Sequence, residues 1–146
     1  MLADPHDLAR FVEAQDRDYA HALAEIRSGR KRSHWMWYVF PQLEGLGASP
    51  TSRHFAIKSA DEARAYLAHP VLGPRLLECA EALLHVNAGS AHDIFGSPDD
   101  FKLRSCATLF ASVSQQDSVF HRVLDKYFAG EPDDRTLQLL AARRRS

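Results

Sequence analysis

The segment DLARFVEAQDRDYAHALAEIRSG, residues 7–29, carries the clearest helical pattern in the chain. Apolar or near-apolar side chains recur at intervals of three and four residues over about five helical turns. They are Leu8, Phe11, Val12, Gln15, Tyr19, Ala22, Leu23 and Ile26. Asp7 suits the cap position before a helix, and Gly29 suits the position after one. The segment therefore predicts a long amphipathic helix with one buried face.

Further helical segments, separated by Gly and Pro, occupy most of the remaining chain. We expect helices over residues 59–68, 74–86 and 98–113, from Asp117 to just before Gly130, and from Asp133 to a basic tail at 143–146 that frays. Residues 41–58 carry Gly45, Gly47 and Pro50 and indicate a long irregular connection. No β-type alternation of useful length occurs. The prediction is an all-α fold: one compact domain over residues 1–146, with about six to eight helices and no sheet.

Length and composition favour a soluble globular protein. The chain has 146 residues, of which 45% are hydrophobic and 25% charged, with a net charge of −1. That charge argues against a nucleic-acid partner, and no apolar run approaches the roughly 20 residues of a membrane span. The N-terminus lacks the features of a signal peptide. Cys79 and Cys106 lie in apolar helical contexts, so we expect reduced, buried thiols in a cytoplasmic protein that is a monomer or a weak dimer.

The common catalytic motifs are absent from the sequence. The eight histidines are scattered, and no pair has the i,i+4 spacing that places two imidazoles on one helical face. The chain has no CxxC, no phosphate-binding glycine loop and no nucleophile elbow. We therefore expect neither a metal nor a cofactor. Whether the protein is an enzyme stays open. If it is one, His34 is the first candidate acid or base because its ordinary pKa suits neutral pH, and Asp100 is the second.

The stretch RKRSHWMWYVFPQ, residues 30–42, concentrates large aromatic side chains. Some of residues 35–40 must be core, since a domain of this size needs their area. In a helical turn and a half, however, aromatic side chains point to all sides, and not all of them reach one core. His34 and Gln42 bracket the stretch with polar groups. An apolar wall with a few convergent polar groups is typical of a small-molecule site.

The segment 98–113 has two unlike faces. Leu103, Cys106, Ala107, Phe110 and Val113 form an apolar face, and the opposite face carries small hydroxyl side chains such as Thr108. Such a face packs against a neighbouring helix or lines a polar pocket, and the sequence does not decide between the two. Lys102 stands at its edge.

Several segments together resemble a known family. They are GRKRSHWMWYVFPQLEGLG (29–47), FVEAQ (11–15), YLAHPVLGPRLLEC (66–79), IFGSPDDFKLRSCATLF (94–110) and FHRVLDKYFAGEPDDRTLQLL (120–140). They are similar to the bacterial domain-of-unknown-function family numbered 1810. The resemblance covers nearly the whole chain and implies a compact multihelical domain without an assigned reaction. A fainter similarity, in FVEAQ and in Lys126-Tyr127-Phe128, is to all-helical proteins proposed to act on ADP-ribose derivatives.

These observations predict a pocket for a small anionic or nucleotide-like ligand, of ADP-ribose type, between the 34–42 stretch and the 98–113 helix. Trp35 or Trp37 would stack on the ligand. Hydrogen bonds would come from His34, Gln42 and Thr108, and the anion would meet Lys31, Arg32 or Lys102. The alternatives are a protein–protein interaction module with an exposed aromatic patch and an uncharacterised hydrolase acting on ADP-ribose derivatives.

Overall fold

The computed structural model describes residues 3–87 and 89–145, with side chains up to Arg143. Nine helices lie in this part of the chain, and six of them have at least seven residues. They are α1 (Ala9–Ser28), α2 (Met36–Val39), α3 (Pro50–His54), α4 (Ala60–Ala68), α5 (Leu72–His85), α6 (Ala91–Phe95), α7 (Asp99–Ser112), α8 (Val119–Phe128) and α9 (Asp134–Arg145). The only β-type pairing among these residues is an isolated bridge between Leu43 and Ile57. The prediction of an all-α fold is confirmed. The helix count exceeds the predicted six to eight, and three of the nine helices, α2, α3 and α6, have only four or five residues.

The long N-terminal stripe forms α1, as predicted. Phe11, Ala22 and Ile26 are fully buried, and Gly29 ends the helix in the left-handed conformation. The predicted cap at Asp7 is wrong, because Asp7 itself has a positive φ of 51°. Asp4 takes that role instead: its carboxylate accepts hydrogen bonds from the backbone N–H groups of Leu8 and Ala9, at 2.7 and 3.0 Å. The pKa of Asp4 is lowered mainly by these two bonds.

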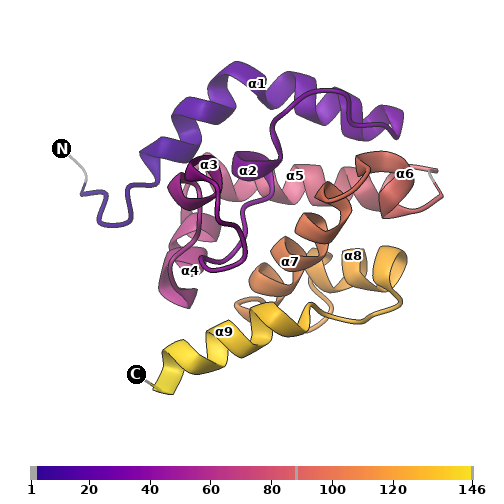
Figure 1. Cartoon of the computed structure of the whole chain (residues 1–146). Coiled ribbons are helices and arrows are strands. Elements are labelled where there is room, and N and C mark those ends of the chain that lie inside the picture. Colours follow the sequence, from indigo (N-terminus) through magenta and orange to yellow (C-terminus); the bar gives the residue numbers. More distant parts are fainter. Residues whose placement is uncertain (1–2, 88, 146) are drawn as a thin grey trace.

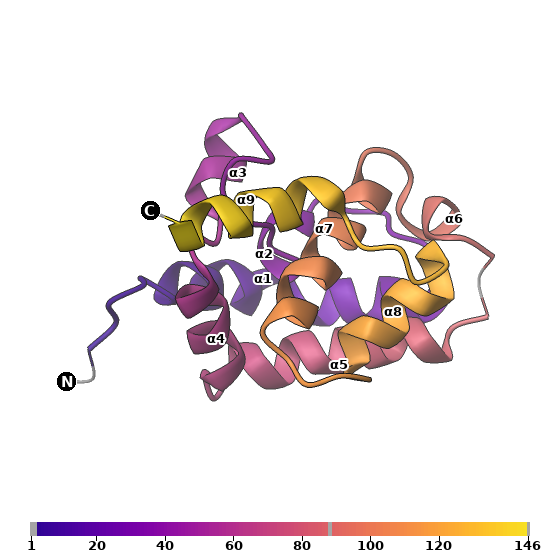
Figure 2. The ribbon, with the colours of Figure 1, turned by 90° about the horizontal axis from the view of Figure 1, so that it is seen from below.

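Helix α7 lies at the centre of the molecule. It contacts α4, α6, α8 and α9, while α1 and α5 run side by side across the same core (Figure 1). The view from below shows α9 crossing α7 on the side away from α1 (Figure 2). Residues 105–111 are all buried, so both faces of this helix pack against protein. Of the two interpretations of its hydroxyl face, packing against a neighbouring element is the one observed.

The aromatic stretch becomes α2 and its flanks. Residues 35, 36 and 38–40 are buried, and Trp37 alone within 35–40 is half-buried. The connection that follows is less irregular than predicted, since it contains α3. Ser49 caps α3 by accepting a hydrogen bond from the backbone N–H of Ser52 at 3.1 Å, and Pro50 occupies its first turn.

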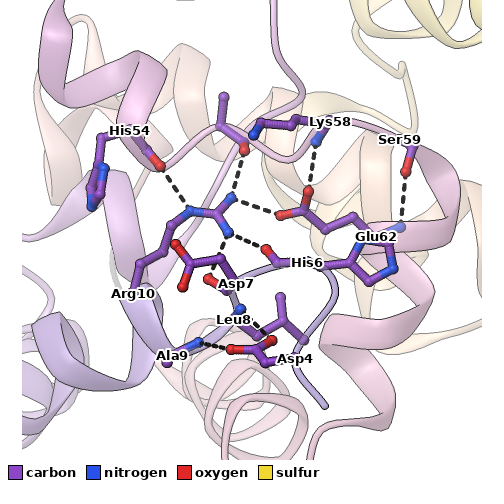
Figure 3. Close-up of polar contacts among 11 residues, drawn as sticks. Asp4, His6, Asp7, Leu8, Ala9, Arg10, His54, Lys58, Ser59 and Glu62 are labelled. Carbon is purple, nitrogen blue, oxygen red and sulfur yellow. Dashed lines mark hydrogen bonds and ion pairs between the residues drawn. The ribbon is translucent and has the colours of Figure 1, made fainter.

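A buried arginine joins the N-terminal segment, α1, the end of α3 and α4 (Figure 3). The Arg10 guanidinium donates to the Glu62 carboxylate at 2.7 Å and to the carbonyl oxygens of His6, Asp7, His54 and Ala56 at 2.6–2.8 Å. The two side chains are 6% and 2% exposed. Glu62 also accepts from the backbone N–H of Lys58 at 3.2 Å. All five guanidinium bonds are therefore intramolecular, and this network is structural.

The remaining sequence expectations concern the cysteines, the membrane and the tail. Cys79 and Cys106 are free and buried, as predicted. Burial raises the pKa of both thiols, that of Cys79 to about 12. None of the helices within residues 3–87 and 89–145 combines the length and apolarity that crossing a bilayer requires. The basic tail was expected to begin at residue 143. In the structure this residue belongs to α9, and the Arg143 guanidinium donates to the carbonyl oxygen of Glu44 at 2.8 Å.

Candidate functional site

A hollow of about 410 Å³ lies where the loop after α1 meets α2 and the first turn of α7. We call it the cationic hollow, because three cationic side chains and one carboxylate line it. These charged residues are Lys31, Arg32, Lys102 and Asp99, and the wall is completed by Ser33, His34, Met36, Trp37, Phe95, Ser97 and Pro98. The hollow adjoins part of the 34–42 stretch and the first turn of α7, and the hydroxyl face of α7 at Thr108 does not line it.

Asp99 is held between two lysines in this hollow. Its Oδ2 is 2.9 Å from the Nζ of Lys31, and its Oδ1 is 3.2 Å from the Nζ of Lys102. The side chains of Lys31, Lys102 and Asp99 are 8%, 22% and 17% exposed. Two ammonium groups share one carboxylate, so the cluster keeps a net positive charge. A partly desolvated excess of positive charge favours an anion far more than a solvated lysine does.

The two tryptophans have different roles. Trp35 is 1% exposed, and its indole N–H donates to the Glu25 carboxylate at 2.9 Å. Trp37 is half-buried and lines the hollow, and its indole N–H donates to no acceptor in the described part of the protein. The Nζ of Lys102 lies 5.2 Å from the centre of the Trp37 ring, a cation–π contact. Trp37 is therefore the tryptophan that a ligand in the hollow can reach.

Glu25 holds the loop that carries the cations. Its carboxylate accepts from the backbone N–H groups of Arg32 and Ser33, at 2.7 and 3.0 Å, and from the Ser33 hydroxyl at 2.6 Å, besides the Trp35 indole. Partial burial by itself would raise the pKa of Glu25, but the bonds from Ser33, Arg32 and Trp35 outweigh it and lower the pKa to about 2. The loop is thus fixed by an ionised carboxylate at its base.

The two candidate acid–base residues are placed differently. His34 is exposed at the hollow, and its imidazole has no hydrogen-bond partner among residues 3–87 and 89–145. Asp100 lies outside the lining of the hollow. One of its oxygens is 3.5 Å from both the His92 Nδ1 and the Ser97 hydroxyl. Ser97 also contacts Nδ1 of His92, so both neighbours meet the same ring nitrogen. A relay needs the two nitrogens on opposite partners, and this cluster does not provide it.

The other predicted ligand-binding residues divide into three groups. Lys31, Arg32, His34, Trp37 and Lys102 line the cationic hollow. Gln42 lines a second, smaller hollow of about 20 Å³, the apolar slot, which shares Met36, Trp37 and Lys102 with the cationic hollow. Trp35 and Thr108 line neither. Thr108 is 2% exposed; its hydroxyl donates to the Arg104 carbonyl and accepts from the backbone N–H of Asp133, both at 2.8 Å.

Two site residues were not predicted from the sequence. Asp99 lies in the first turn of α7, where a carboxylate suits the positive end of the helix dipole, and this position does not predict its ion pairs with Lys31 and Lys102. Glu25 lies on the predicted 7–29 helix outside its apolar face. Its position in the sequence does not indicate that the loop after the helix folds back and donates hydrogen bonds to its carboxylate. The described residues contain no group of three or more His, Cys, Asp or Glu side chains that could hold a metal ion.

Comparisons with known proteins agree with this fold. The model of a family described as "Protein of unknown function (DUF1810)" matches residues 5–140. The chain is also similar to the conserved hypothetical protein Rv1873 from Mycobacterium tuberculosis, known from its crystal structure. The two share 51% identity over 94% of this chain and 99% of that one, with a TM-score of 0.92. No protein with a curated description matches the chain significantly.

Proposed function

This chain belongs to the DUF1810 family, whose function is unknown, and we propose that it binds a small anionic, nucleotide-like ligand in the cationic hollow. The Lys31–Asp99–Lys102 cluster is the observation that carries the proposal. Lys31 is nearly buried, yet it shares its one carboxylate partner with a second lysine. An anion entering the hollow would satisfy both ammonium groups at once.

The walls of the hollow support a ligand that also has a ring. Trp37 offers an aromatic face beside Lys102, and Ser33, His34 and Ser97 offer polar groups around it. A volume of about 410 Å³ is within the range of small-molecule sites, about 300–1,000 Å³. An ADP-ribose-type compound combines phosphates with a stacking base and is the first ligand to test. We place this activity in the cytoplasm.

The burial of the aromatic stretch favours this proposal over an interaction module. Residues 35, 36 and 38–40 are buried in the core, which leaves Trp37 as the half-buried aromatic of the stretch. One half-buried ring offers little apolar area to a protein partner. Binding does not decide whether the protein also hydrolyses its ligand. Chromatography of the binding mixtures for hydrolysis products of ADP-ribose tests that alternative.

Calorimetric titration of the full chain with pyrophosphate and ADP-ribose tests the proposal. Lys31→Ala and Lys102→Ala should each weaken binding about tenfold or more, since each removes a charge-assisted bond worth about 1.5–3 kcal/mol. Lys58→Ala is the matched control, because Lys58 is exposed and lies outside the hollow, and it should bind as the wild type does.

Asp99→Asn separates anion recognition from general damage to the site. It removes the carboxylate that occupies both ammonium groups, so pyrophosphate should bind at least as tightly as to the wild type. If Asp99→Asn and the lysine variants all weaken binding equally, the lysines act through stability and the proposed site is wrong. If none of the anions binds the wild type, the proposal fails as a whole.

A further inference from the structure

Trp37 and Lys102 stand between the cationic hollow and the apolar slot, because both side chains line both spaces. The slot extends between α2 and the α3 connection. Its deeper walls are Phe40, Leu43, Phe55 and Ala56, with Gln42 and Ser52 as polar members. A charged compartment and a mainly apolar one therefore adjoin at Met36, Trp37 and Lys102.

No hydrogen bond within the described part of the chain holds the Trp37 side chain in place. Among the described residues, one cation–π contact with Lys102 is the polar interaction of the Trp37 ring, and its N–H has no acceptor there. Trp35, two positions earlier, is fixed by the Glu25 carboxylate and by full burial. A rotation of Trp37 would open the slot to the hollow without breaking a hydrogen bond. The same rotation at Trp35 would leave a buried N–H unsatisfied.

The slot is mainly apolar, and its polar side chains are Gln42, Ser52 and Lys102. At about 20 Å³ it has room for roughly one molecule, and a water needs two to four polar partners to be held well. Most of the walls are aromatic or aliphatic carbon. An apolar group that displaces a poorly held water gains affinity.

We propose that the ligand of this protein is an amphiphilic anion. Its phosphate or similar oxyanion pairs with Lys31 and Lys102 in the cationic hollow, and a small apolar group attached to it enters the slot past Trp37. This inference rests on the proposed function and narrows it, because it requires an apolar group next to the anion. Compounds that carry only charge would fill half of the site.

A series of n-alkyl phosphates, from methyl to hexyl phosphate, tests the inference on the full chain. Calorimetry should show affinity rising about fourfold with each methylene, the factor that corresponds to the burial of one methylene group, until the slot is full. Trp37 is the tryptophan that moves, so the longer phosphates should change the intrinsic fluorescence more than methyl phosphate does. In Trp37→Phe that extra change should disappear.

Two variants of the slot make the test specific. Ala56→Leu fills the slot and should abolish the dependence on chain length while leaving the affinity for methyl phosphate unchanged. Ala20→Leu, at an exposed position of α1, is the matched control and should keep the full dependence. If Ala56→Leu proves unfolded by circular dichroism, Gln42→Leu replaces it; this change makes the slot more apolar and should steepen the dependence.

Each outcome decides one claim. Equal affinity for methyl and hexyl phosphate in the wild type overturns the inference and leaves the anion site standing. A chain-length dependence that survives Ala56→Leu, or that Gln42→Leu leaves unchanged, places the apolar group elsewhere and also overturns it. Absence of binding by every phosphate, pyrophosphate included, overturns the proposed function itself.

Discussion

Four donors from one short loop converge on the carboxylate of Glu25, and this residue shows how much of the site depends on a single side chain. The loop carries Lys31, Arg32 and His34 to the cationic hollow, and the Lys31 N–H donates to the carbonyl oxygen of Ile94 at 2.7 Å. Glu25 holds the loop from the last turns of α1, at distances of 2.6–3.0 Å. Such bonds to an ionised group are roughly twice as strong as neutral ones.

Glu25→Gln should lower the free energy of unfolding by about 1–2 kcal/mol at pH 7, because charge-assisted bonds become neutral ones. The pKa of Glu25 is depressed from 4.5 to about 2, so its stabilising contribution is fully present above 4.5 and is lost as the pH falls toward 2. Urea unfolding of wild type and variant should therefore converge between pH 4.5 and pH 2. Glu13→Gln, at an exposed position of the same helix, is the control and should cost little. A difference that is constant with pH would contradict this role of Glu25.

At the scale of helices, the sequence predicted the elements with a long apolar face or a clear cap, including the short turn that Ser90 and Asp93 cap at the start of α6, and it missed α3. The pattern for α1 and the Pro-Asp-Asp start of α7 placed both helices within about two residues. Helix α3 was taken for irregular chain because five residues cannot show a period, although Ser49-Pro50 is a helix start. Asp117 was expected to open α8, yet Ser118 caps it by accepting from the backbone N–H of His121.

The hydroxyl face of α7 gives a test at this scale. Thr108 links α7 to the start of α9, because its hydroxyl accepts from the backbone N–H of Asp133. Thr108→Val keeps the shape but leaves that N–H without its acceptor, so it should cost about 1–3 kcal/mol in the free energy of unfolding. Thr51→Val, at an exposed position of α3, should change little. Equal costs for the two variants would mean that the Thr108 bond adds nothing to the docking of α9.

For the whole molecule, the all-α class could be predicted from the sequence, while the contacts that fix the candidate site could not. Periodicity indicates which face of a helix is buried, and this is enough to assign the helical class. It does not indicate which carboxylate a loop folds back to, as with Glu25, or which loop residue pairs with a helix, as with Lys31 and Asp99. Trp35 is 10 positions from Glu25 and Lys31 is 68 positions from Asp99, so the second contact forms only after the helices have packed.

Arg10 makes five hydrogen bonds that connect separate segments of the N-terminal half (Figure 3). Its guanidinium joins the segment before α1, the end of α3 and α4, and Glu62 is its buried counter-charge. Arg10→Met leaves the Glu62 carboxylate buried without a cation and should cost about 3–5 kcal/mol in the free energy of unfolding. Arg10→Met combined with Glu62→Gln removes that charge while an amide oxygen still accepts from Lys58, so the double variant should be more stable than Arg10→Met alone.

Chemical denaturation of the two variants and the wild type measures this difference. Arg64→Met provides the matched control, since Arg64 pairs with Asp61 on the surface, where the side chains are 56% and 83% exposed. It should cost no more than about 1 kcal/mol, as exposed ion pairs do. If Arg10→Met is as mild as Arg64→Met, the five bonds of Arg10 do not hold α1, α3 and α4 together. In that case the helices keep their places through apolar packing alone, and the loop that forms the apolar slot is anchored at the Leu43–Ile57 bridge instead.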